Sequence, residues 1–535
     1  MTGLVLLGDE AIGQGALDAG LSGVYAYPGT PSTEITEFIQ RSKEARERKV
    51  HAKWSANEKT AMESGLGMSY AGKRAMVCMK HVGLNVAADA FINAGMTGVN
   101  GGLVVVVADD PSMHSSQNEQ DSRFYGKFAM IPVLEPATQQ EAYDMTRYGF
   151  ELSEKFLLPV MLRITTRLAH SRSAVVKSDN RKENEIELPG DLKQFILLPA
   201  LARRRYKLLL SVQDKLEAEG LSSGLNRIEQ GEDHSKGIIA CGLSYNYYQE
   251  VAAEAGLKHP VLKISQYPLA PELLNDFVKQ VDRVLVFEEG APMLEESLTG
   301  VLENTYQIEG RLNGLLPRDG ELDPRLVKKA LEIPLETPRE VPEIVKNRPP
   351  ALCKGCSHID MYNALGEALE PYGPGRVFSD IGCYTLGALP PYNAINSCVD
   401  MGASIPMAKG ASDAGLRPAV AVIGDSTFTH SGMTGLLDVV VEQTPVTVII
   451  SDNSTTGMTG GQQSHATNRL EEICRGIGVE EEHLRVMNPL RKHHEENMLM
   501  LVHELAYEGV SVIIAQRECI QTVSRRLRNQ KSVKS

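Results

Sequence analysis

Uninterrupted apolar strands are the feature that most restricts how this chain can fold. The stretches LVVVVA at 103–108 and VTVII at 446–450 are apolar at consecutive positions, so both faces of each strand must be buried. Such strands alternate with helical patterns, as in GVYAYPGTPSTEITEFI, where Ser32 or Thr33 can cap the helix. The pattern predicts an α/β protein built on doubly wound parallel sheets.

Changes in composition divide the 535 residues into predicted domains. Two large α/β segments span 1–180 and 351–535, and a smaller α/β segment spans 236–315. Residues 181–235 are polar with one helical stretch, which indicates a linker. Residues 316–350 contain seven prolines, which indicates an extended linker.

Charge and hydropathy exclude several classes of protein. A net charge of −13 argues against a general nucleic-acid binder. The N-terminal run MTGLVLLGDEA meets Asp9 and Glu10 too soon to be a signal peptide, and the apolar runs fall far short of the ~20 residues that span a bilayer. We therefore expect a cytoplasmic protein. The basic end RRLRNQKSVKS is interpreted as a solvated tail or, alternatively, a docking patch for an acidic partner.

The eight cysteines are expected to be reduced thiols in that compartment. Cys353 and Cys356 form one CxxC pair, and Cys383 and Cys398 follow at wide spacing. The chain has neither the close four-cysteine spacing of a ferredoxin nor a second CxxC at zinc-ribbon distance. The sequence thus predicts no iron–sulfur cluster on this chain. The CxxC pair is open to three readings: structural thiols, the lining of a cofactor site, or metal ligands.

Polar side chains follow two apolar strands near the C-terminus. Asp425 follows PAVAVIG and Asn453 follows TPVTVIISD, with 26 residues between Ser426 and Asn453. That length fits one crossover helix and the next strand, so both side chains should reach one edge of the sheet. Carboxylate and amide oxygens suit Mg²⁺ that carries a phosphate, and Gly424 permits close backbone approach. Two ordinary loop caps are the plain alternative.

This arrangement resembles the thiamine-diphosphate motif, Gly-Asp-Gly followed at a distance by Asn, with Ser426 in place of the last glycine. Thiamine enzymes also need a glutamate at N1′ of the aminopyrimidine, which promotes removal of the thiazolium proton. Glu58, in WSANEKTAMESG, is the candidate. Taken alone, Glu58 could equally be a charge at a helix start.

Further segments extend the resemblance. AYPGTPSTEI, WSANEKTAMESG, MKHVGLNVAADAF, HSSQNEQDSRFYGKFAMIPVLEP, LCKGCSH, DIGCYTLG and GDSTFTHSG resemble, in order, the large subunit of indolepyruvate:ferredoxin oxidoreductase. That family belongs to the 2-oxoacid:ferredoxin oxidoreductases. The resemblance implies aminopyrimidine-binding (1–180) and diphosphate-binding (351–535) domains flanking a small domain that resembles the C-terminal domain of transketolase.

The resemblance also implies roles for particular residues. Thr30 is expected to approach the substrate, and Arg123 to meet its carboxylate, the alternative being a surface cation paired with Glu119 or Asp121. His430 is expected to pack at the phosphate loop. The positions implied at the cofactor are Glu58, Lys80, His81, Asn85, Cys383, Gly424, Asp425, Ser426 and Asn453. The implied Mg²⁺ ligands are Asp425, Asn453 and Thr455.

The implied reaction is oxidative decarboxylation of a 2-oxoacid, such as indolepyruvate, to an acyl-CoA. Because large subunits of the family usually continue into a ferredoxin-like domain, which this sequence lacks, we expect the electrons to pass to iron–sulfur clusters on a partner subunit. The expected partners are a second copy of this chain, a smaller (beta/gamma-type) subunit and a ferredoxin-like carrier.

Two other functions stay open. A 2-oxoacid decarboxylase would release an aldehyde without a partner, and a degenerate subunit would serve structure alone. The presence of Glu58, Asp425 and Asn453 argues against the degenerate subunit. The segment CKGCSHID also departs from the family's usual motif, Pro-Gly-Cys-Pro-His-Arg, because it has no basic residue after His358.

Overall fold

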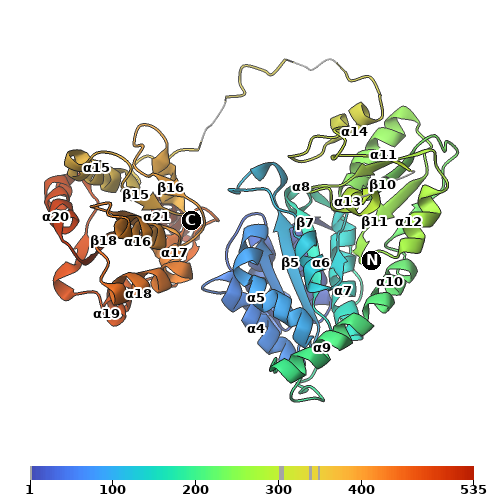
Figure 1. Cartoon of the computed structure of the whole chain (residues 1–535), viewed down its shortest axis with the longest axis horizontal. Helices are drawn as coiled ribbons and strands as arrows, with labels where there is room; N and C mark the ends of the chain where they lie inside the picture. Colours follow the sequence, from blue (N-terminus) through green and yellow to red (C-terminus); the bar gives the residue numbers. More distant parts are fainter. Residues whose placement is uncertain (1–2, 301–305, 337–339, 347–349, 535) are drawn as a thin grey trace. The chain divides into compact units, whose positions relative to one another are not determined.

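Two units, Met1–Arg339 and Glu340–Ser535, make up the computed structural model (Figure 1). The structure describes residues 3–300, 306–336, 340–346 and 350–534. Within those residues, no helix combines the length and the apolar character that crossing a membrane requires.

Seven strands form the central sheet of the first unit, and all are parallel except the edge strand β12. In spatial order they are β12 (Gln266–Tyr267), β6 (Val133–Leu134), β7 (Val160–Thr165), β5 (Leu103–Asp109), β4 (Ala75–Lys80), β2 (Gly23–Ala26) and β3 (His51–Trp54). A short two-stranded antiparallel sheet joins β1 (Gly3–Leu7) and β8 (Arg172–Val176).

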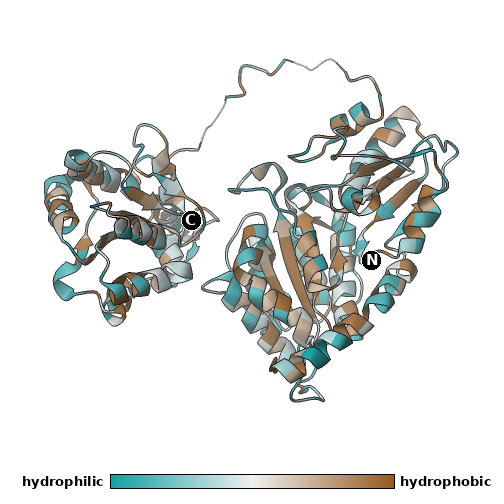
Figure 2. Cartoon of the chain, in the orientation of Figure 1, coloured by the Kyte–Doolittle hydropathy of each residue, from teal (hydrophilic) through white to brown (hydrophobic). Residues whose placement is uncertain are grey.

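Helices cover both faces of this sheet, as the apolar runs predict. Along β5, Val104 and Val106 join the core on one face, while Val105 and Val107 join the core on the other. Each buried aliphatic side chain contributes about 1.5–3 kcal/mol. Figure 2 shows the hydrophobic colouring of these strands. The first face packs against α1 (Gly8–Asp18), α2 (Thr33–Arg41) and α7 (Gln139–Phe156), and the second against α4 (Glu58–Tyr70) and α5 (His81–Thr97).

Shorter helices complete this part of the unit. They are α3 (Lys43–Glu47), α6 (Arg123–Ala129) and α8 (Thr166–His170). The helical stretch predicted within 181–235 is present as α9 (Pro199–Ser211) and α10 (Gln213–Ser222).

A second, five-stranded sheet lies in the same unit. Its order is β14 (Gln307–Glu309), β13 (Arg283–Phe287), β10 (Gly237–Cys241), β11 (Val261–Ile264) and β9 (Arg227–Glu229). Its helices are α11 (Ser244–Ala255), α12 (Pro271–Val278), α13 (Met293–Thr299) and α14 (Pro324–Ala330).

This small α/β region is wider than the predicted segment 236–315. Strand β9 comes from the predicted linker 181–235, and α14 from the proline-rich linker 316–350. Pro324 begins α14, a position where proline favours a helix, and Val327 packs into the core of this sheet. At Pro324, therefore, the proline marks a helix start that packs into the core rather than a linker.

Six parallel strands form the sheet of the second unit. Their order is β16 (Ser397–Cys398), β15 (Val377–Ser379), β17 (Val420–Gly424), β18 (Val446–Asp452), β22 (Val510–Gln516) and β21 (Leu484–Met487). The helices are α15 (Ser357–Leu369), α16 (Ser404–Asp413), α17 (Asp425–Thr427), α18 (Met433–Glu442), α19 (Leu470–Ile477), α20 (His494–Ala506) and α21 (Ile520–Lys534). Helices α16 and α18 cover one face, and α15 and α20 the other.

Candidate functional site

Asp425 and Asn453 stand at the same edge of the second-unit sheet. Strands β17 and β18 are parallel neighbours with Gly424 opposite Ser451, as the spacing predicts. Asp425 is the first residue of α17, directly after β17, and Asn453 directly follows β18. The carboxyl ends of parallel strands are where open α/β sheets bind ligands.

The Asp425 carboxyl is buried and has an unused acceptor. The side chain is 2% exposed, and Oδ2 has no hydrogen-bond partner in the described part of the chain. Burial raises the pKa of Asp425 to about 7, and the Asp452 carboxylate adds to the rise, against the hydroxyl of Ser464. A bound cation would satisfy this oxygen and hold the group ionised.

The neighbouring oxygens suit a cation site. Asn453 Oδ1 accepts a hydrogen bond from the Thr455 backbone N–H at 3.1 Å. The Thr455 hydroxyl donates to the Gln462 carbonyl at 2.9 Å, which leaves its oxygen lone pairs available. Ser426 Oγ lies 2.9 Å from Thr456 Oγ1. The donor set is therefore rich in hard oxygens, which Mg²⁺ prefers.

Two predicted residues of this region have packing roles. A Cβ at Gly424 would lie 2.6 Å from the Tyr384 ring, so the strand needs glycine there to accommodate that ring. His430 is buried beside the loop, and its Nδ1 lies 2.5 Å from Ser431 Oγ.

Four cysteines from three separate segments of the sequence line one cavity of about 100 Å³ in the second unit. They are Cys353, Cys356, Cys383 and Cys519. Asn453 and His358 line the same cavity, and His358 Nδ1 lies 2.9 Å from Cys356 Sγ. Burial raises the pKa of the Cys383 thiol to about 12.

The fold explains why Cys519 joins this group. Strand β22 lies beside β18, so the residues after β22 emerge next to Asn453, and the Cys519 backbone N–H donates to the Asn453 carbonyl at 3.1 Å. The sequence argument against a cluster considered spacing along the chain only, whereas the fold brings cysteines from three separate segments to one cavity.

In the first unit, Glu58 is the first residue of α4 and is 5% exposed. Asn57 caps the helix by accepting the Thr60 N–H at 2.8 Å. The Glu58 carboxyl lies against Gly83 of α5, where an added Cβ would stand 2.5 Å from Oε1. The start of α5 therefore needs glycine at position 83 to leave room for the Glu58 carboxyl.

Lys80, His81 and Thr30 gather near that turn. Lys80 ends β4, and its Nζ donates to the Ser115 carbonyl at 2.5 Å; burial lowers its pKa to about 8. A Cβ at Gly29 would meet the Lys80 side chain at 3.3 Å, which places the Thr30 turn beside it. His81 Nε2 lies 3.3 Å from the Asn118 carbonyl. The structure thus brings several predicted residues to the carboxyl ends of β2 and β4.

Asn85 and Arg123 lie in different environments. Asn85 is exposed and accepts a hydrogen bond from the Tyr125 hydroxyl at 2.7 Å. The Arg123 guanidinium is fully buried, paired with Asp121 at 2.5 Å and Glu288 at 2.9 Å. Of the two readings of Arg123, the pairing with Asp121 is present, although inside the protein rather than on its surface.

Comparison with protein families matches both units to thiamine-diphosphate-binding models. Residues 14–195 match the model described as "Pyruvate flavodoxin/ferredoxin oxidoreductase, thiamine diP-bdg". Residues 380–507 match "Thiamine pyrophosphate enzyme, C-terminal TPP binding domain".

Curated relatives extend over nearly the whole chain. The indolepyruvate oxidoreductase subunit IorA of Archaeoglobus fulgidus is 39% identical over 98% of this chain and 88% of its own length. The IorA subunit of Pyrococcus abyssi is 40% identical over 96% of this chain and 85% of its own. The 2-oxoglutarate synthase subunit KorA of Methanocaldococcus jannaschii is 29% identical over 32% of this chain and 48% of its own.

Among solved structures, the 2-oxoglutarate:ferredoxin oxidoreductase from Magnetococcus marinus, determined with 2-oxoglutarate, coenzyme A and succinyl-CoA bound, shares the fold. It matches 62% of this chain and 65% of its own chain, with a TM-score of 0.51 and 18% identity.

Proposed function

The chain belongs to the family of indolepyruvate oxidoreductase IorA subunits, and we propose that it is the thiamine-diphosphate-binding subunit of such an enzyme. The reaction is the oxidative decarboxylation of a 2-oxoacid to an acyl-CoA. An arylpyruvate such as indolepyruvate is the substrate class.

One observation in the structure carries the proposal. The buried Asp425 Oδ2 has no hydrogen-bond partner in the described residues, and it stands at a strand end next to the one that Asn453 follows. A buried acceptor without a partner is costly, and Mg²⁺ carrying a diphosphate removes that cost. Asp425, Asn453 and Thr455 would hold the ion, with Ser426 beside the diphosphate.

We propose that Glu58 contacts N1′ of the aminopyrimidine, and its local setting in the first unit supports this. It starts a capped helix, is buried, and is held against Gly83. Thiamine diphosphate, when bound, supplies a nucleophilic carbon and accepts the electron pair left by departing CO₂. Lys80 and His81 lie where β4 meets α5, the helix whose Gly83 contacts Glu58, and Thr30 would face the substrate from the turn beside Lys80.

The iron–sulfur cluster that accepts the electrons could lie on a partner subunit or on this chain. The partner subunit is the location expected from the sequence. The cavity lined by Cys353, Cys356, Cys383 and Cys519 offers thiolate donors of the kind that hold a [4Fe–4S] cluster. Such a cluster would supply one-electron transfer, and we propose that this cavity holds one.

The assembly is proposed to contain a second copy of this chain, a smaller beta/gamma-type subunit and a ferredoxin-like carrier, in the cytoplasm. Coenzyme A is the proposed acyl acceptor, which the ligands of the Magnetococcus marinus enzyme support.

Activity of the native complex tests the proposal. With indolepyruvate, coenzyme A, thiamine diphosphate and Mg²⁺, we expect reduction of an acceptor dye and formation of an acyl-CoA. Release of an aldehyde at a similar rate without dye would favour the alternative, a non-oxidative 2-oxoacid decarboxylase.

The Asp425→Asn variant should lose the binding of thiamine diphosphate, which calorimetry measures. Unchanged binding in this variant would contradict the proposed cofactor site.

A further inference from the structure

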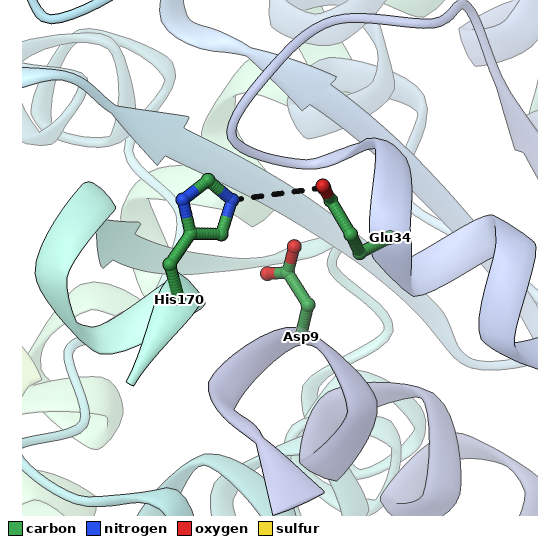
Figure 3. A group of neighbouring side chains, drawn as sticks. All are labelled: Asp9, Glu34 and His170. Atoms are coloured by element: carbon green, nitrogen blue, oxygen red, sulfur yellow. Dashed lines mark ion pairs between the residues drawn. The ribbon is translucent and has the colours of Figure 1, made fainter. Parts of the chain in front are cut away.

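Three ionisable side chains outside the proposed cofactor site converge in the first unit (Figure 3). Asp9 lies at the start of α1, Glu34 in the first turn of α2, and His170 at the end of α8. Their potential ligand atoms all lie within 4.8 Å of one another. In Figure 3 the three side chains point toward a common centre.

Glycines allow the three helices to come this close. A Cβ at Gly8 would lie 2.2 Å from the Leu168 carbonyl oxygen of α8. A Cβ at Gly13 would lie 2.8 Å from the Phe38 side chain of α2. The Gly8 contact is with backbone, so α1 can approach α8 this closely only with glycine there, whereas a side chain at position 13 would require the Phe38 ring to shift.

Three carboxylate oxygens of this cluster lack hydrogen-bond donors among the described residues. Asp9 is 0% exposed, and in the described residues neither of its oxygens has a hydrogen-bond partner; the same holds for Glu34 Oε2. His170 Nε2 forms an ion pair with Glu34 Oε2 at 3.7 Å, the dashed line in Figure 3, which is longer than a hydrogen bond. Desolvation and the Glu34 charge raise the pKa of Asp9 well above its usual value. His170 lowers the pKa of Glu34, whereas Asp9 has no cationic partner among the described residues.

We propose that Asp9, Glu34 and His170 bind a divalent cation such as Mn²⁺ or Zn²⁺. Two carboxylate oxygens and one imidazole nitrogen form a donor set that these ions accept. The ion's two positive charges balance both carboxylates and satisfy the oxygens that lack donors. His170 is exposed and Glu34 half-buried, so the site is open to solvent on one side.

The cation would tie α1, α2 and α8 together near the Thr30 turn. Helix α2 starts directly after this turn, where the Gly29 N–H donates to Thr33 Oγ1 at 3.0 Å and Ser32 Oγ donates to the Gly29 carbonyl at 2.9 Å. Fixing the first turn of α2 therefore holds the backbone that presents Thr30. The role is one of positioning and does not depend on the Asp425 site.

Counting bound Mn²⁺ tests the site. Mn²⁺ is the probe because thiolates compete strongly for Zn²⁺ but weakly for Mn²⁺. The full chain, stripped with chelator and titrated with Mn²⁺ under paramagnetic resonance detection, should bind one equivalent more than the Asp9→Asn variant. Glu37→Gln, on α2 outside the cluster, is the matched control and should bind as the wild type does. Equal stoichiometry in the wild type and Asp9→Asn would overturn the proposal.

Thermal unfolding adds a second readout. Added Mn²⁺ should raise the Tm of the wild type. The rise in Tm should be smaller in both Asp9→Asn and His170→Asn, because these variants lose the stabilisation from the cation at this site. If Asp9→Asn instead raises the Tm without Mn²⁺ and leaves the Mn²⁺ count unchanged, the two carboxylates share a proton and the site is refuted. Asp425→Asn removes a different equivalent, so failure of the proposed function is distinguishable from failure here.

Discussion

The Glu58 carboxyl rests directly on the Cα of Gly83, with so little room that a methyl group there would come within 2.5–2.8 Å of Oε1, Cγ and Cδ of Glu58. Gly83 lies in the first turn of α5 and Glu58 at the first position of α4, so the contact joins two helix starts. The orientation of the proposed catalytic acid thus depends on Gly83, a residue that has no side chain.

Gly83→Ala should therefore impair activity more than stability. Displacing Glu58 by even a fraction of an ångström is expected to lower kcat on the order of 10–100-fold.

Glu58→Gln should abolish turnover while leaving the fold intact, as near-ultraviolet circular dichroism can check.

The control for Gly83→Ala is Gly67→Ala. Gly67 is an exposed position of α4 with no atom within 4 Å of an added Cβ, so alanine should stabilise the helix by about 0.5–1 kcal/mol and leave kcat unchanged. Wild-type activity in Gly83→Ala would show that Glu58 does not need this orientation.

Protons should compete with Mg²⁺ for Asp425. Burial raises its pKa to about 7 from an unfolded value of about 3.9. The apparent Mg²⁺ dissociation constant at saturating thiamine diphosphate should hence rise as pH falls below 7, approaching about tenfold per pH unit. Titration calorimetry measures it, corrected for Mg²⁺ binding to the free diphosphate. Asp438→Asn, an exposed carboxyl of α18, should keep this pH dependence.

The same shift affects stability without the cofactor and Mg²⁺. A carboxyl whose pKa is raised on folding stabilises the folded state fully below pH 4, and that contribution is lost as pH rises through 7. Urea unfolding between pH 5 and 8 should show this loss in the wild type and less of it in Asp425→Asn. An identical pH profile in both proteins would mean that Asp425 is not the titrating group.

Arg123 should be essential for stability because it neutralises a buried acidic cluster. Its guanidinium pairs with Asp121 and Glu288, both buried, and hydrogen-bonds the Glu289 and Ala291 carbonyls. Arg123→Met removes the cation that pairs with both carboxylates and leaves Asp121 with Arg163 at 3.7 Å and Glu288 with backbone N–H donors, which should cost about 3–5 kcal/mol of unfolding free energy.

The exposed pair Arg41–Glu37 provides the comparison, since Arg41→Gln should cost less than about 1 kcal/mol. A stable Arg123→Met protein with a raised KM for the 2-oxoacid would instead support the carboxylate contact expected from the family.

Strand pairing at the Asp425 site was predictable because buried parallel strands leave a strong local signal. Consecutive apolar residues identify β17 and β18, and the length between them fits one crossover helix. Contacts between distant segments leave no such signal. Cys519 reaches Asn453 because β22 pairs with β18, and Arg123 is buried in part by the chain near Glu288, which is distant in the sequence. Both facts follow from tertiary packing, which spacing along the chain does not encode.

The four-cysteine cavity predicts iron and sulfide on this chain. Purified anaerobically, the wild type should contain about four irons and four sulfides per chain, the composition of one [4Fe–4S] cluster. Cys356→Ser should lose most of both, because the cavity then lacks one thiolate ligand. Cys474→Ser is the control, since Cys474 is buried in the core on the α18 face, outside this cavity, and should keep wild-type content. Iron-free wild-type protein that still supports dye reduction together with its partner subunit would place the electron relay on the partner alone.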